Sequence, residues 1–268
     1  IHVLPSYQKA HFSENPDMNL CVSGSVFNTI DFDGNLELNW EKNLEQEITW
    51  AKELHATHIR YDLKTRTLAN LDSRAALLEG LSRITSEGLE LVICLEGDYY
   101  YTKQEYLNSI YTDATFIAQE FEPAYMIIFN EINGKLLSNV RETVPRNNWL
   151  PDITNISSRI KSLSPTTKTV VTVLASLDGL AAFNATLTLG SSVDALGVSY
   201  FPVFYGWRVK QLLDYRTIFD AAGSSKEFWL TEIGTNSFNQ GEDAQARFLT
   251  KILSLASDLE GCLLYTSP

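Results

Sequence analysis

Apolar and polar residues alternate along this chain with two different periods. Short, continuous apolar runs bounded by polar turns are typical of strands buried in a parallel sheet. Between these runs, apolar residues recur about every 3.6 positions, which indicates amphipathic helices. One such helical face carries Trp40, Leu44, Ile48, Ala51 and Leu54. Strands that alternate with helices in this way predict βα units and a parallel sheet.

The pattern predicts eight strands and seven helices. The strands are Leu20–Phe27, His58–Leu63, Leu89–Leu95, Tyr125–Phe129, Thr169–Leu174, Ala195–Tyr200, Phe228–Thr231 and Gly261–Tyr265. The helices are Leu38–Ala56, Ser73–Glu87, Lys103–Phe121, Pro151–Leu163, Gly179–Leu189, Val209–Ala222 and Asp243–Leu259. We therefore predict an α/β fold, a single (β/α)8 TIM barrel over residues 1–268, truncated at the C-terminus so that the last helix is missing. A doubly wound open sheet is the alternative.

Composition and charge exclude several classes of partner. The net charge of −12 argues against nucleic acid and anionic membranes, because phosphate binding needs clustered Lys and Arg. No apolar stretch approaches the roughly 20 residues that span a bilayer, so we expect a soluble chain, and a monomer. The three cysteines lack metal-type spacing, and we expect buried free thiols. The four histidines form no ligand cluster, so we predict no metal and no cofactor.

Two predicted strands end in a glutamate. Tyr125–Phe129 runs into Asn130 and Glu131, and the strand that starts at Phe228 reaches Glu232. In a β/α-barrel the C-terminal strand ends point into the active site, so these carboxylates can face each other across it. Paired carboxylates are the groups that cleave a glycosidic bond. The sequence therefore predicts a retaining glycoside hydrolase.

Three stretches resemble a known family. Asn-Glu after the fourth strand and Glu after the seventh resemble the retaining glycosidases of clan A, which share a β/α-barrel. Within that clan, residues 130–134 (Asn-Glu-Ile-Asn-Gly) and residues 197–206 (Gly-Val-Ser-Tyr-Phe-Pro-Val-Phe-Tyr-Gly) resemble the arabinogalactan endo-β-1,4-galactanase family. Tyr205 stands where that family has a histidine, and Phe204 where it has a tryptophan. The resemblance implies an endo-acting enzyme, a polysaccharide substrate with β-1,4-galactan first, and secretion.

The resemblance also assigns roles. Glu131 would be the general acid/base and Glu232 the nucleophile, while Arg60 would hold Glu232 or else form an ordinary ion pair with Asp62. Asn130 would bind the sugar 2-hydroxyl, or cap a loop.

Four further residues are expected to line the substrate site. Tyr200 would donate its hydroxyl to Glu232, or simply pack. Tyr205 and Trp207 would stack on sugar rings, or pack against a loop, and Asp98 would bind a sugar hydroxyl or shape its turn.

Three other functions stay open. A β-mannanase or β-glucanase of the same clan would use the same two glutamates. A non-catalytic carbohydrate-binding barrel would have no need of both an acid and a nucleophile glutamate. An aldolase or isomerase would need a Schiff-base lysine, a metal cluster or a phosphate site, and Lys64 is the nearest candidate lysine.

Overall fold

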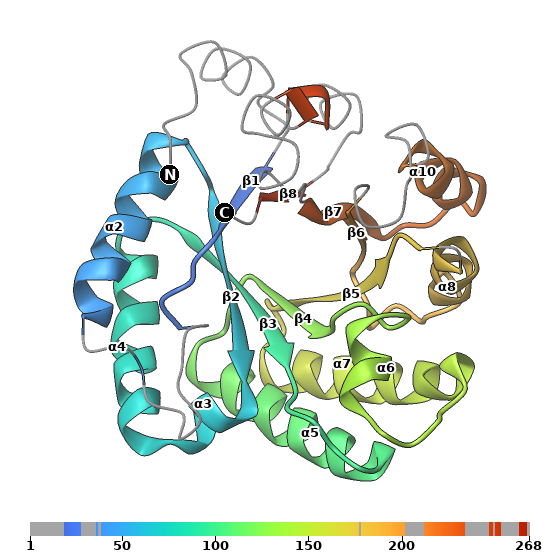
Figure 1. The fold of residues 1–268 in the computed structure, drawn as a ribbon, viewed down its shortest axis with the longest axis horizontal. Coiled ribbons are helices and arrows are strands. Elements are labelled where there is room, and N and C mark those ends of the chain that lie inside the picture. The colour runs from blue at the N-terminus through green and yellow to red at the C-terminus, as the bar shows by residue number, and fades with distance from the viewer. Residues whose placement is uncertain are drawn as a thin grey trace.

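The computed structural model describes residues 19–27, 36, 39–176, 178–201, 212–233, 247–248, 250–252 and 263–266. Within them, parallel strands form a closed barrel in chain order (Figure 1). They are β1 (Asn19–Ser23), β2 (His58–Lys64), β3 (Glu90–Glu96), β4 (Tyr125–Phe129), β5 (Lys168–Leu174), β6 (Ala195–Tyr200), β7 (Glu227–Ile233) and β8 (Leu263–Thr266). Because β8 pairs with both β7 and β1, the sheet has no free edge. The predicted TIM barrel is confirmed, and the open sheet is excluded.

The helices lie around the outside of the strands (Figure 1). They are α2 (Trp40–Glu53), α3 (Thr65–Ala69), α4 (Leu71–Ser86), α5 (Lys103–Glu120), α6 (Lys135–Asn139), the 3-10 helix η1 (Arg146–Trp149), α7 (Leu150–Leu163), α8 (Gly179–Thr186) and α10 (Leu212–Ala221). The short helix α3, directly after β2, was not predicted. Of the helix predicted over 243–259, only residues 247–248 and 250–252 are described. In the described chain, no helix has the length and apolar character needed to cross a membrane.

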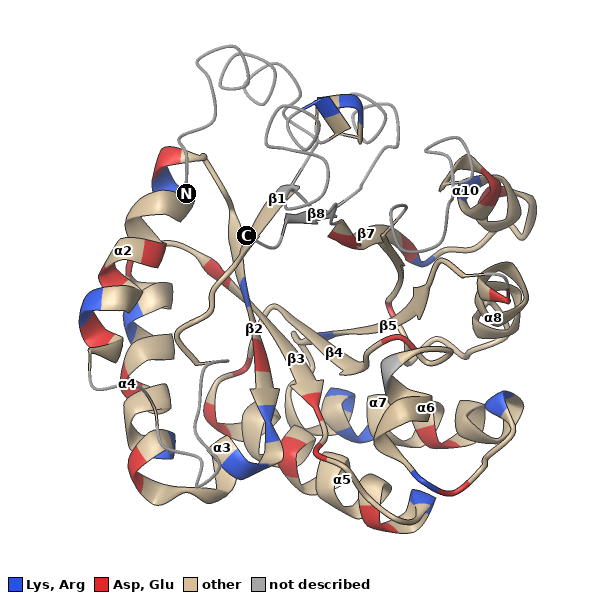
Figure 2. Cartoon of the chain, viewed as in Figure 1, with Lys and Arg blue, Asp and Glu red and all other residues tan. Residues whose placement is uncertain are grey.

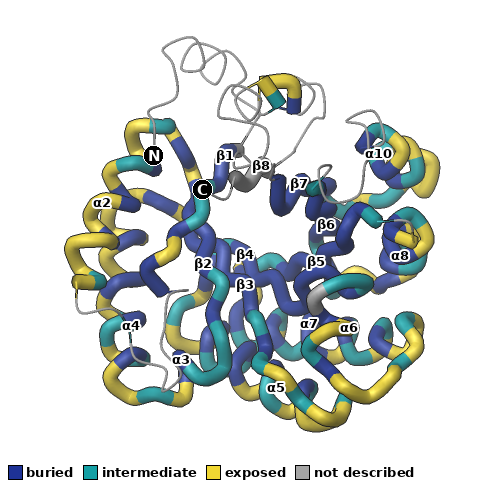
Figure 3. Tube along the Cα trace, in the orientation of Figure 1, coloured by how far each residue is buried: buried dark blue, intermediate teal, exposed yellow. Residues whose placement is uncertain are grey.

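The core has two layers, and the strands that lie between them are mostly buried (Figure 3). The outer layer fills the space between strands and helices, and the inner layer fills the barrel. Members of the inner layer are Cys21, Val92, Cys94, Tyr125, Ile127, Val170, Ala195 and Trp229. The rings of Tyr125 on β4 and Trp229 on β7 lie 4.4 Å apart, so the two sides of the barrel meet inside it. Cys21 and Cys94 are buried free thiols, as predicted, and Cys262 lies outside the described residues.

A polar cluster lies at the end of the barrel where the strands begin. The Glu227 carboxylate accepts hydrogen bonds from Lys168 Nζ, from the Tyr125 hydroxyl and from Trp229 Nε1. Around the outside, acidic and basic positions are scattered over the helices (Figure 2). Tyr125 and Trp229 thus belong both to this cluster and to the inner layer of the core.

Candidate active site

Glu131 stands directly after β4 in an unusual backbone conformation. All five residues of β4 are buried, and Glu131 itself is 4% exposed. Its φ of 51° is left-handed, which costs a non-glycine residue about 1–3 kcal/mol. The turn is held by hydrogen bonds from the main-chain nitrogens of Gly134 and Leu136 to the Glu131 oxygen, at 2.7 and 3.3 Å. The chain therefore leaves the strand sharply, and the glutamate stays at the barrel mouth.

Gly134 leaves room for the Glu131 side chain. A Cβ at position 134 would lie 3.0 Å from Glu131 Oε2 and 3.1 Å from a methyl group of Leu174. The neighbouring Asn133 fixes the same loop to the end of β5, since its amide accepts from the Leu174 nitrogen at 2.8 Å and donates to the Leu174 oxygen at 2.9 Å. The carboxylate of Glu131 is thus surrounded by a rigid turn.

Glu232 lies near the end of β7, after a β-bulge. Val198 on β6 pairs with Leu230, but Ser199 pairs with Glu232, so Thr231 is the extra residue. A bulge re-aims the side chains that follow it, and such irregularities are frequent beside active sites. Glu232 is 7% exposed. Its direction is therefore determined by an irregularity between two otherwise regular strands.

Arg60 lies on β2, which β8 and β1 separate from β7 in the closed barrel, and it binds Glu232 across the barrel. The side chain is 2% exposed, and its Nη2 donates to Glu232 Oε1 at 2.7 Å. Nε donates to Asp62 Oδ1 at 2.7 Å, and Nη1 donates to the Thr231 main-chain oxygen at 3.3 Å. Because the guanidinium is planar, it holds its partners in fixed directions. Arg60 therefore contacts both carboxylates that the sequence analysis considered as its partners, Glu232 and Asp62.

Asn130 connects the two glutamates. Its Nδ2 donates to Glu232 Oε1 at 3.2 Å, although it precedes Glu131 directly in the chain. Its Oδ1 accepts from Thr172 Oγ1 on β5 at 2.8 Å. The same Thr172 oxygen accepts from the Glu131 main-chain nitrogen at 2.7 Å. Side chains of β2, β5 and β7 and the residues after β4 thus meet in one buried network of hydrogen bonds, which contains the Glu232 carboxylate and the Glu131 main-chain nitrogen.

A sequence comparison assigns the chain to a family. Residues 81–260, more than half of the chain, match the family described as the glycosyl hydrolase catalytic core. The chain belongs to this family. It is therefore a glycoside hydrolase, and no curated protein matches it by sequence.

Solved structures with the same fold carry several glycosidase activities. The glycoside hydrolase is similar to one of two fungal β-1,4-galactanases, with a TM-score of 0.64, 16% identity, and 93% and 89% of the two chains covered. It is also similar to a family 5 glycoside hydrolase of Prevotella bryantii B14 in complex with a xyloglucan tetradecasaccharide. There the TM-score is 0.68 and the identity 12%, with 95% of this chain and 90% of that chain covered. A third similar structure is the endo-1,4-β-D-mannanase of Thermotoga petrophila RKU-1, with a TM-score of 0.61, 12% identity, and 82% of each chain covered. At these identities the likeness concerns the fold alone.

The predicted hydrogen bond from Tyr200 to Glu232 is wrong. The Tyr200 side chain is fully buried, and its hydroxyl has no hydrogen-bond partner among the described residues. In the β6–β7 register Ser199 pairs with Glu232 and Tyr200 with Ile233, and successive residues point to opposite faces of a sheet. Tyr200 accordingly packs with Ile233 in the outer core of the glycoside hydrolase. Burial raises the pKa of its phenol to about 12.

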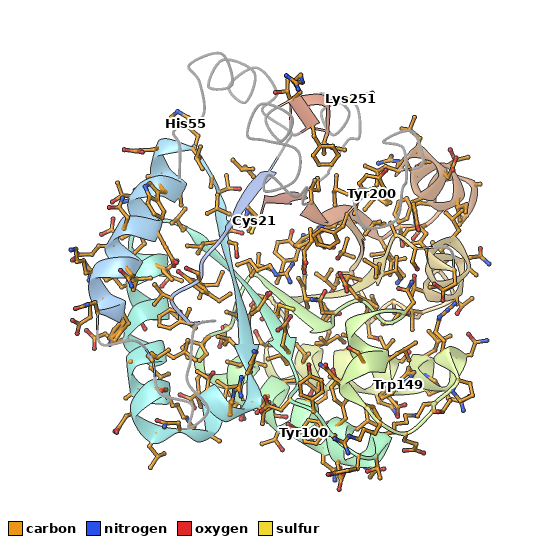
Figure 4. The ribbon with its side chains drawn as sticks, in the orientation of Figure 1. Cys21, His55, Tyr100, Trp149, Tyr200 and Lys251 are labelled. Carbon is orange, nitrogen blue, oxygen red and sulfur yellow. The ribbon has the colours of Figure 1, made fainter. Side chains whose placement is uncertain are left out.

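Asp98 lies in the loop between β3 and α5 and contacts α3. Its Oδ2 accepts from the Arg66 main-chain nitrogen at 3.1 Å, and its Oδ1 lies 3.8 Å from Arg66 Nε. These contacts fit the loop-shaping role considered for it. In Figure 4 the neighbouring Tyr100 lies at the edge of the barrel, far from Cys21 in its middle. Tyr205 and Trp207 lie outside the described residues.

Two neighbours of the candidate site, Thr172 and Thr231, were not found from the sequence, and Asp62 was considered only as an ion-pair partner of Arg60. Asp62 had a signal, because it stands two residues after Arg60 on the same face of β2. Thr172 and Thr231 read as ordinary strand residues, since β-branched side chains are common in strands. Over the residues described, no cluster of three or more His, Cys, Asp and Glu side chains is arranged to hold a metal ion.

Proposed function

We propose that this glycoside hydrolase cleaves β-linked polysaccharide with retention of configuration, as one catalytic domain. The observation that carries the proposal is the buried contact of Glu232 Oε1 with Arg60 Nη2 at 2.7 Å and with Asn130 Nδ2 at 3.2 Å. A carboxylate that accepts two such bonds is held ionised and oriented, as a nucleophile must be. Glu131, next to Asn130 in the chain, supplies the second carboxyl group.

The reaction takes two displacements. In the first, Glu232 attacks the anomeric carbon while Glu131 gives its proton to the glycosidic oxygen, and the bond to the leaving sugar breaks. In the second, Glu131 takes a proton from water, whose oxygen attacks the same carbon and releases Glu232. Two inversions restore the original configuration, and the carboxyl groups return to their starting protonation.

The leading substrate is β-1,4-galactan. The support is the resemblance of residues 130–134 and 197–206 to the galactanase family, together with the shared fold of the fungal β-1,4-galactanases. β-Mannan and β-glucan follow, because the mannanase and the xyloglucan-bound enzyme share the same fold. Asn130 is proposed to bind the sugar 2-hydroxyl, Tyr205 and Trp207 to stack on sugar rings, and Asp98 to border the site.

Reducing-sugar release from galactan, mannan, glucan and xylan tests the proposal. Wild type should act on one polymer, and Glu131→Gln and Glu232→Gln should each lose at least about a thousandfold in kcat. Glu227→Gln is the matched control, since Glu227 lies at the other end of the same strand as Glu232. It should keep the wild-type rate per folded molecule.

Proton NMR of the first sugar anomer released from an aryl β-glycoside tests retention. The β-anomer should appear first and then mutarotate. If the α-anomer appears first, the retaining mechanism is refuted. If folded wild type releases no sugar from any of the four polymers, the proposed substrates are refuted, and the non-catalytic carbohydrate-binding barrel becomes the leading alternative.

A further inference from the structure

The hydroxyl of Thr172 lies between the side chain of Asn130 and the main chain of Glu131. Thr172 is fully buried on β5. Its Oγ1 is 2.8 Å from Asn130 Oδ1 and 2.7 Å from the Glu131 main-chain nitrogen. Its main-chain oxygen also accepts from the Ile132 nitrogen at 3.0 Å. One residue of β5 therefore holds three consecutive residues of the loop after β4.

The direction of the hydroxyl proton follows from these contacts. A threonine hydroxyl has one proton to donate and accepts through its lone pairs. The Glu131 main-chain N–H can only donate, so Thr172 Oγ1 must accept from it. The proton is then directed to the oxygen of the Asn130 amide, which turns the amide nitrogen towards Glu232. Thr172 thus determines which end of Asn130 the nucleophile meets.

The methyl group of Thr172 keeps the hydroxyl in this position. Gly197 on β6 lies between the methyl groups of Thr172 and Thr231, and a Cβ built on it would lie 3.1 Å and 2.4 Å from them. Because a β-branched side chain is stiff about χ1, placing the methyl group also places the hydroxyl. The missing side chain at Gly197 therefore makes space for both threonines.

We propose that Thr172 is a positioning residue of the hydrolytic reaction. It acts through Asn130, by keeping the amide nitrogen towards Glu232 and the sugar 2-hydroxyl. The proposal rests on the proposed retaining mechanism for its effect on rate. The orientation of Asn130 that it describes does not depend on that mechanism.

Thr172→Val removes the hydroxyl and keeps the shape, and Thr172→Ser keeps the hydroxyl. The matched control is Thr169→Val, because Thr169 is also fully buried on β5 and donates its hydroxyl to the Ser192 oxygen, at the far end of the strand. Thr172→Val should lower kcat/KM on the aryl β-glycoside by about tenfold to a hundredfold. Thr172→Ser should recover most of that loss, and Thr169→Val should cause little.

Two comparisons separate positioning from general packing. On the 2-deoxy form of the same glycoside, which lacks the hydroxyl that Asn130 would bind, Thr172→Val should cost less than about threefold. In an Asn130→Ala background it should likewise cost little more than Asn130→Ala alone, because the partner through which it acts is gone. Equal losses on both substrates and in both backgrounds would overturn the proposal.

A measurement without substrate makes the test independent of activity. The Asn130 side-chain NH₂ signal in a ¹⁵N-labelled protein is assigned by its disappearance in Asn130→Ala. Thr172→Val should shift this signal and speed its exchange with water, whereas Thr169→Val should leave it in place. An unchanged signal in Thr172→Val overturns the proposal, whether or not the wild type hydrolyses a glycan. A shifted signal with an inactive wild type sustains the positioning role and refutes the proposed function alone.

Discussion

Replacing Arg60 by methionine should destabilise the protein strongly. Methionine keeps much of the volume but removes the cation that binds Asp62 and Glu232, whose side chains are 16% and 10% exposed. Both carboxylates then stay largely buried without the guanidinium. Removing one partner of a buried ion pair costs about 3–5 kcal/mol. In a chain of this length, about 2 °C of Tm is lost per kcal/mol, so Tm should fall by about 6–10 °C.

Thermal unfolding followed by circular dichroism measures this loss, and two further variants interpret it. Adding Asp62→Asn and Glu232→Gln to Arg60→Met should recover at least half of the lost Tm, because neutral amides are cheaper to bury than carboxylates that have lost their cation. Lys168→Met breaks the pair with Glu227, whose two side chains are 44% and 35% exposed. It should cost less than about 1 kcal/mol, because water already screens that pair. If Arg60→Met unfolds no earlier than Lys168→Met, the assignment of Arg60 as a buried structural cation is refuted.

Three further predictions follow from the described contacts. Gly134→Ala should lower kcat about tenfold with little change in Tm, because its methyl group would crowd the Glu131 carboxylate; an unchanged kcat contradicts this. Burial raises the pKa of Asp113 from 3.8 to about 6, so the folded state holds its proton more tightly than the unfolded state, and stability falls as pH rises between these values. Asp113→Asn should therefore raise the free energy of unfolding by up to about 3 kcal/mol at pH 7.5 and by little at pH 4. Equal effects in thermal unfolding at the two pH values would contradict this. Buried Glu47 accepts from the Tyr61 hydroxyl and from two main-chain nitrogens, so Glu47→Ala should cost about 3 kcal/mol in urea unfolding, against about 1 kcal/mol for Tyr61→Phe.

The fold and the centre of the site could be predicted from the sequence for one physical reason. A strand buried on both faces must be apolar throughout, so a charged residue at its end is conspicuous. Glu131 and Glu232 stand out in this way, and Arg60 stands out as a cation within an otherwise strand-forming segment. The alternation of strands with helices then fixes the strand order, because connections between parallel strands are short and right-handed.

The arrangement around these residues depends on register, which a single sequence does not encode locally. The bulge at Thr231 decides where Glu232 points, and it also puts Tyr200 on the opposite face from Glu232. No periodicity in Phe228–Ile233 marks that extra residue, since every position there is compatible with a strand. For the same reason Thr172 looked like a strand former, although its hydroxyl holds Asn130 and Glu131. The five-residue helix α3 was missed because so short a segment carries too little pattern.

The pairing of the first described strand with the last one constrains how the molecule is made. Leu20 of β1 pairs with Leu264 of β8, so the ring of strands cannot close until almost the whole of residues 20–264 has left the ribosome. At about 5–20 residues per second, β1 waits on the order of ten seconds or more for its second neighbour. Such distant contacts also carry a large loop-closure cost, which makes them late steps in folding. During that interval the growing sheet has two open edges, on β1 and on the most recently made strand, and open edges are where chains join one another into aggregates. Production of this enzyme should therefore be limited by the survival of the seven-stranded intermediate more than by the stability of the finished barrel.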